Sequence, residues 1–191
     1  MLQPEHATAE KASLAATPCV LVDALNVAYW SGNPPSLRLP LALMTQLLAD
    51  GHRALMVFDA SAPHQLKHEH DLYRQLLQHS NHCIETPSGR SADGVLLRLA
   101  RLNAACIVSR DHYRDHRRRY RKLIDDASRL HAGWVRDGCI HVPSLALSAP
   151  LAASTEAAFQ QLCRQLQSLP SINSAAAVAS GIRLPSAEAV T

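Results

Sequence analysis

Short runs of apolar residues recur along the chain, separated by longer stretches in which apolar and polar positions alternate with helical spacing. Each run is four to six residues long, the length of a strand that is buried on both faces. We expect strands at residues 18–23, 54–59, 82–86, 104–109 and 139–142. The spacing between them predicts helices at residues 39–50, 63–78, 91–102 with Ser91 as N-cap, and 113–132.

Strands and helices alternate through five strands, which is the pattern of a parallel sheet with helices on both faces. Because crossovers between parallel strands are right-handed, the expected fold is α/β, a Rossmann-like three-layer α/β/α sandwich with a mostly parallel five-stranded sheet. This domain is expected at residues 18–145, after a flexible N-terminal arm at residues 1–17. We expect a C-terminal helix in residues 146–169, with helical spacing over 155–168, and a disordered Ser-, Ala- and Pro-rich tail at 170–191.

Beyond the pattern of apolar positions, the composition is informative mainly through the distribution of charged residues along the chain. Apolar residues make up 47% of the 191-residue chain, enough for a buried core, and the formal net charge is only +3. Seven of the 19 Lys and Arg residues lie between positions 110 and 122, a basic stretch of the kind that attracts phosphate. The five cysteines lack metal-binding or redox spacing, and no apolar run has the length of a signal peptide or a membrane span. We therefore expect a soluble cytoplasmic protein with reduced cysteines and no membrane partner.

Acidic residues stand where the expected strands end or where the next helix begins. In an open parallel sheet, ligands bind beyond the carboxyl ends of the strands, so these carboxylates are expected to share one cleft. Converging carboxylates repel one another unless a cation lies among them, and hard oxygen ligands favour Mg²⁺ or Mn²⁺. The expected metal ligands are Asp23, Asp93, Asp111 and Asp115. Asp59, which closes the second strand, either caps the following turn or supports the ligands from behind.

Three segments resemble the motifs of one nuclease family. Residues 22–28 (VDALNVA) resemble the opening motif of the NYN branch of PIN-like ribonucleases, and residues 107–115 (IVSRDHYRD) resemble its later motif. Residues 91–96 (SADGVL) fall where the family carries its middle acid. The order and intervals of the three are similar to those of the Regnase (MCPIP) subgroup, and the resemblance covers roughly residues 18–145.

The resemblance implies a PIN-like fold and a Mg²⁺- or Mn²⁺-dependent endoribonuclease that leaves a 5′-phosphate and a 3′-hydroxyl. The family's active-site residues match Asp23, Asn26, Asp93, Asp111 and Asp115 of this chain. In this interpretation Asn26 orients a water molecule or a neighbouring carboxylate. PIN-like domains often pair, which leaves a homodimer open.

Arginines beside the acids are expected to hold a polyanionic substrate, preferably single-stranded or looped RNA. The predicted RNA contacts are Arg110, Arg114 and Arg118. Nearby aromatic residues either stack on bases or pack over the edge of the sheet, and these are Tyr29, Trp30 and Tyr113. His64 and His68 lie four residues apart on an expected helix, but without a third ligand we expect them to be surface residues.

Two positions depart from the family pattern. The family often has paired acids where this chain has Ala92 and Asp93, and it usually has Asn where this chain has Arg110. One ligand is therefore missing or comes from another residue such as Asp59. An RNA-binding module with the same fold and weak or absent catalysis remains the alternative. A phosphatase with Asp23 as nucleophile is less favoured, because such enzymes generally carry a second Asp where this chain has Leu25.

Overall fold

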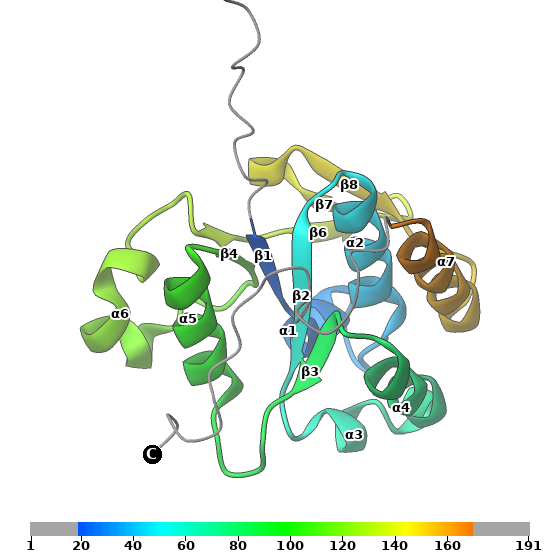
Figure 1. The fold of residues 1–191 in the computed structure, drawn as a ribbon, viewed down its shortest axis with the longest axis horizontal. Coiled ribbons are helices and arrows are strands. Elements are labelled where there is room, and N and C mark those ends of the chain that lie inside the picture. Colours follow the sequence, from blue (N-terminus) through cyan, green and yellow to red (C-terminus); the bar gives the residue numbers. More distant parts are fainter. Residues whose placement is uncertain (1–18, 170–191) are drawn as a thin grey trace, which may run out of the picture.

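The computed structural model describes residues 19–169, which form two sheets and the helices around them (Figure 1). The larger sheet has five strands in the order β3-β2-β1-β4-β5, and every neighbouring pair is parallel. Its strands are β1 (Cys19–Asp23), β2 (Arg53–Phe58), β3 (Cys83–Glu85), β4 (Cys106–Val108) and β5 (Leu130–His131). The expected α/β fold with a parallel five-stranded sheet is confirmed, whereas the predicted arm at 1–17 and tail at 170–191 lie outside the described residues.

Helices cover both faces of this sheet. They are α1 (Ala24–Ala28), α2 (Arg38–Ala49), α3 (Ala62–Gln65), α4 (His70–His79), α5 (Ala92–Asn103), α6 (Arg117–Ile124) and α7 (Thr155–Ser168). Alternate residues of β1 enter different cores: Val20 packs in the cluster with α1, α2 and α4, and Leu21 packs in the cluster with α5 and α6. Figure 1 shows α5 and α6 on one side of the sheet and α2, α4 and α7 on the other. The three layers follow from these two apolar faces.

The fifth strand of the parallel sheet was predicted wrongly. Residues 139–142 do form a strand, β7 (Cys139–Val142), but it pairs antiparallel with β6 (Trp134–Arg136) and β8 (Leu147–Pro150) in a separate sheet. Asp137 and Gly138 join β6 to β7 with φ angles of 51° and 72°, the left-handed conformation that a two-residue hairpin turn requires. The fifth parallel strand is instead β5, which falls inside the helix predicted at 113–132.

Two predicted helices are not continuous over their expected ranges. The helix at 113–132 reduces to the 3₁₀ turn η3 (Arg114–His116) and α6, and the one at 63–78 is split into α3, η2 (Lys67–Glu69) and α4. The split places Glu69 where its carboxylate accepts hydrogen bonds from the Leu37 N–H and from the hydroxyls of Ser36 and Thr155. Further 3₁₀ turns are η1 (Tyr29–Ser31) and η4 (Pro143–Leu145).

The ends of the remaining helices agree more closely with the sequence. Ser91 is the N-cap residue of α5, but its side chain makes no capping hydrogen bond. The expected helix at 155–168 is confirmed as α7, with β8 in front of it. All five cysteines are free, and no helix in residues 19–169 has the length and apolar character needed to cross a bilayer.

Candidate active site

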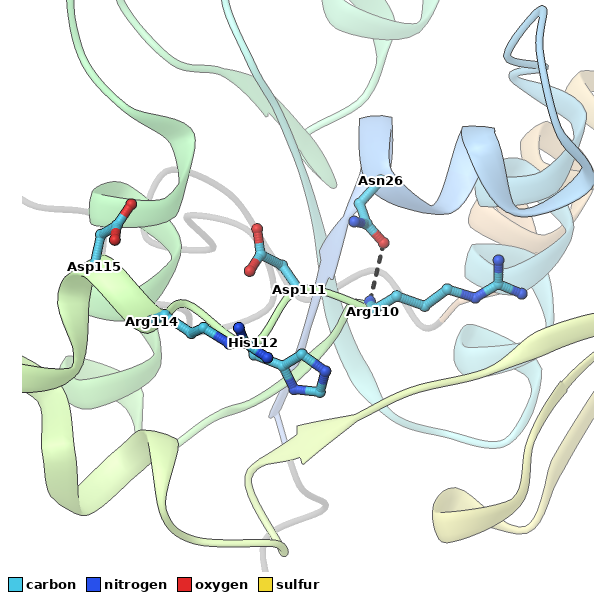
Figure 2. Close-up of a pocket in the computed structure, with 6 residues that line it drawn as sticks. All are labelled: Asn26, Arg110, Asp111, His112, Arg114 and Asp115. Carbon is cyan, nitrogen blue, oxygen red and sulfur yellow. Dashed lines mark hydrogen bonds between the residues drawn. The ribbon is translucent and has the colours of Figure 1, made fainter.

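The carboxyl ends of β1 and β4 carry an open pocket of about 480 Å³ at the edge of the parallel sheet (Figure 2). The parallel register sets Val22 beside Val108, so the residues that follow both strands meet at this edge. The lining residues are Asn26, Arg110, Asp111, His112, Arg114 and Asp115. Five of these six residues were singled out from the sequence, and His112 was not.

Asp23 lies behind the pocket and is only 8% exposed. Its carboxylate accepts hydrogen bonds from the hydroxyls of Ser109 (2.9 Å) and Tyr113 (3.3 Å) and from the backbone N–H of Asn26 (3.4 Å). Burial and, to a lesser extent, the negative charge of Asp93 raise the pKa of this carboxyl to about 6, although the three hydrogen bonds oppose the shift. Asp23 is therefore a desolvated carboxyl whose negative charge is only partly stabilised by its three donors.

Asp93 extends the acidic cluster from the first turn of α5. Burial raises its pKa, and so do the charges of Asp111, Asp59 and Asp115, while His116 opposes the shift. The His116 Nε2 atom lies 4.0 Å from the Asp93 carboxylate. Asp93 is thus close enough to interact electrostatically with each of the other three predicted acids, Asp23, Asp111 and Asp115.

Asn26 holds the loop that carries Asp111. Its amide oxygen accepts hydrogen bonds from the backbone N–H of Arg110 and from the Trp30 indole, both at 3.0 Å. Figure 2 shows its amide nitrogen on the side of Asp111. Asp111 accepts from the Tyr113 N–H (2.7 Å), and its own N–H donates to the Ser109 hydroxyl (3.0 Å). The loop after β4 is consequently tied to α1 through Asn26.

Arg110 turns its guanidinium away from the acids, as Figure 2 shows. Its Nε donates to the Gly133 carbonyl at 2.8 Å, and the guanidinium lies 4.9 Å from the centre of the Trp30 ring. Burial lowers the pKa of this side chain. Only its backbone contacts Asn26, so the predicted phosphate contact of Arg110 has to compete with these interactions.

The other predicted residues divide between pocket and surroundings. Arg114 lines the pocket, whereas Arg118 is exposed on α6 and is absent from the lining. Trp30 and Tyr113 are buried. Both rings therefore pack inside the protein, and neither presents a ring face to a base. Asp59 accepts from the Ser61 N–H at 2.8 Å, as the capping alternative requires, and its charge also acts on Asp93, as the supporting alternative requires.

Comparisons with known proteins agree with this geometry. A family model described as the Zc3h12a-like ribonuclease NYN domain matches residues 17–148, more than half of the chain. The chain belongs to this family. No curated protein matches it, but a solved structure does, the nuclear protein-only RNase P 2 (PRORP2) of Arabidopsis thaliana, with a TM-score of 0.50 at 17% sequence identity. That match covers 72% of this chain and 31% of the plant protein, and at this identity it bears on the fold alone.

Membership of the NYN ribonuclease family makes the chain a relative of RNA-cleaving nucleases, so the donor set can be tested for a divalent cation. Among residues 19–169, no three His, Cys, Asp or Glu side chains lie close enough together to hold a metal as they stand. The chemistry nevertheless fits, because carboxylate oxygens predominate and Asp23 and Asp93 both have pKa values raised partly by other carboxylates. Mg²⁺ needs only one or two protein carboxylates when water and phosphate complete its shell.

Several residues of this NYN domain escaped prediction. Ser109 bridges Asp23 and Asp111, and its position between a buried strand and an acid was the available signal. His116 faces Asp93 because η3 turns its side chain inward, and no sequence pattern indicated that turn. Tyr113 has a left-handed backbone (φ 49°), which is uncommon for a residue other than glycine and marks a constrained loop.

Proposed function

We propose that this protein is a metal-dependent endoribonuclease that hydrolyses phosphodiester bonds of single-stranded or looped RNA, with Asp23, Asn26, Asp93, Asp111 and Asp115 as its active-site residues. One observation supports the proposal: Asp111 and Asp115 line the pocket, and burial together with their charges raises the pKa of Asp93 in the first turn of α5. Such a cluster favours a bound cation, and the open pocket beside it admits an extended strand more readily than a stiff duplex.

The roles of the side chains follow from their exposure. Asp111 and Asp115 are exposed in the pocket and would hold Mg²⁺ or Mn²⁺ from the solvent side, whereas Asp23 would hold it from the end of β1 and Asp93 from the start of α5. When bound, the cation supplies positive charge at the phosphate and lowers the pKa of a water molecule. Asn26 orients the loop of Asp111 and leaves its amide nitrogen free to position that water.

Arginines supply the remaining charge. Arg114 lines the pocket and is exposed, so its guanidinium can reach a phosphate beside the acids and stabilise the negative charge that develops during attack. Arg118 lies farther along the same basic segment and would contact the strand outside the pocket. Arg110 contributes chiefly by tying the loop to Gly133.

The test is cleavage of an end-labelled single-stranded RNA with Mn²⁺, with Mg²⁺ and with EDTA. We expect internal cuts that require the metal and fall at least about 100-fold in Asp111→Asn, the range seen when one charge-stabilising group is lost. Asp50→Asn is the matched control. Asp50 is the C-cap residue of α2, and its side chain accepts a hydrogen bond from the Gln46 amide that an Asn side chain can also accept. Equal cleavage by wild type and Asp111→Asn would contradict the proposal.

An RNA-binding module without turnover is the second candidate. It is favoured by Ala92, which stands where the family often has a second acid, and by the lack of a ready-made group of three ligands in residues 19–169. Under this alternative the folded protein binds RNA, but no metal produces cuts, and Mn²⁺ does not raise the melting temperature.

A further inference from the structure

The outer face of the small antiparallel sheet carries an exposed tryptophan. Along β6 the side chains alternate, so that Val135 packs inward while Trp134 and Arg136 face solvent. Trp134 is 46% exposed, and in the described part of the chain only Leu102 is a comparably exposed large apolar residue. An indole in this position keeps a wide apolar surface in water, and its location in the fold calls for an explanation.

The strand register places polar partners beside this indole. Trp134 stands opposite His141, and His141 stands opposite Ser148, so the three side chains form one row across β6, β7 and β8. The Trp134 and His141 rings are 6.4 Å apart between centroids and tilted by 36°, and the His141 Nδ1 lies 3.3 Å from the Ser148 hydroxyl. We call Trp134, Arg136 and His141 the ring face.

The ring face is joined to the pocket through Arg110. Arg110 lines the pocket, and its Nε bonds to the carbonyl of Gly133, the residue that directly precedes Trp134. Gly133 also has no room for a side chain, because an added Cβ would stand 2.6 Å from the Trp30 ring. The start of β6 is therefore fixed against Arg110 of the loop that carries Asp111, and the ring face begins one residue after this contact.

We propose that the ring face is a base-stacking platform for single-stranded RNA whose phosphate lies in the acidic pocket, with Trp134 as the principal contact. This inference rests on the proposed function. A flat indole next to an imidazole accepts the face of any base, and an adjacent arginine suits the phosphate between two bases. Arg136 can exchange its partner for a phosphate, because its ion pair with Asp137 (3.2 Å) is largely exposed to solvent and therefore weak. The platform would bind bases without reading their sequence.

The experiment measures RNA affinity by fluorescence anisotropy in the Asp111→Asn background, which suppresses cleavage. Two labelled probes of equal length are compared, a single-stranded oligoribonucleotide and one whose central nucleotides are abasic. We expect Trp134→Ala to weaken binding of the normal probe about five- to 150-fold, the range for loss of one stacked base, and to leave the abasic probe unchanged. Trp134→Phe should restore most of the affinity.

Leu102→Ala is the matched control, because it removes an equally exposed apolar side chain at the end of α5. The platform is overturned if Trp134→Ala weakens both probes equally, if it weakens neither, or if wild type binds neither probe. It is also overturned if Trp134→Ala changes the mass of the protein in light scattering and not its RNA affinity, since the ring face then joins protein copies. Base-dependent binding through Trp134, together with no metal-dependent cleavage by the protein that retains Asp111, would support the platform while refuting the nuclease.

Discussion

The buried carboxyl of Asp23 makes a prediction about stability in the absence of metal. Its pKa is about 6 in the folded protein against 3.8 for an unperturbed Asp, so the folded state binds more protons than the unfolded state between these pH values. The free energy of unfolding must then fall as pH rises from 4 to 6. At 1.36 kcal/mol per pKa unit, the full loss is up to about 3 kcal/mol above pH 6.

Asp23→Asn should remove this loss, because the amide has a similar shape and no charge to desolvate. In EDTA, the variant is expected to be more stable than wild type at pH 7.5 by as much as about 3 kcal/mol and equally stable near pH 4. Its amide oxygen can still accept from the hydroxyls of Ser109 and Tyr113. Added Mn²⁺ should reverse the order, since only wild type gains the free energy of metal binding.

Urea unfolding followed by circular dichroism at pH 4, 5, 6, 7 and 7.5 measures both effects. Asp71→Asn serves as the control, because that carboxyl is 99% exposed on α4, and the variant should retain the pH dependence of wild type. If Asp23→Asn were less stable than wild type at pH 7.5 in EDTA, or kept the same pH dependence, the hydrogen bonds to Asp23 would outweigh its desolvation and the reasoning would fail.

Two further predictions concern the residues around this acid. Ser109→Ala removes a donor to the Asp23 carboxylate, so the pKa of Asp23 rises, and the pH at which Mn²⁺ begins to raise the melting temperature should move up by about one unit. An unchanged midpoint would mean that the hydroxyl does not hold the charge. Gly133→Ala would clash with the Trp30 ring and the His141 carbonyl, and denaturant titration should show a loss of about 1–3 kcal/mol. If the variant were as stable as wild type, the segments that carry Gly133 and Trp30 could move apart at little cost in free energy.

The sequence predicted the sheet edge well because two local signals coincide there. An apolar run with an acid at or just after its end predicts both the strand and the end at which the acid lies, which is why Asp23 was expected at the end of β1 and Asp111 just beyond β4. The same criterion gave a wrong prediction for the fifth parallel strand. β5 has only two residues, too short for a pattern, whereas β7 has a good strand pattern but is directed into a hairpin by Asp137 and Gly138.

Side-chain directions were harder to predict because they depend on distant residues. Arg110 was expected at phosphate from its position beside Asp111, but its guanidinium binds Gly133, 23 residues later in the chain. Trp134 had no role in the sequence interpretation, because its exposure depends on the register of β6 with β7. Both cases depend on the position of β6 and of the residue before it, which the pattern of apolar residues does not predict.

The two departures from the family pattern have unequal consequences. At position 110 the contact with the site is the hydrogen bond that the backbone N–H donates to Asn26, and this bond does not depend on the arginine side chain. The side chain adds a hydrogen bond to Gly133, the residue before β6. At position 92 the family's second carboxylate is missing, and the charges that act on Asp93 are those of Asp111, Asp59 and Asp115, with the His116 Nε2 atom 4.0 Å from its carboxylate. A nitrogen donor there suits Mn²⁺ better than Mg²⁺. If turnover is weak in Mg²⁺, position 92 explains it and position 110 does not.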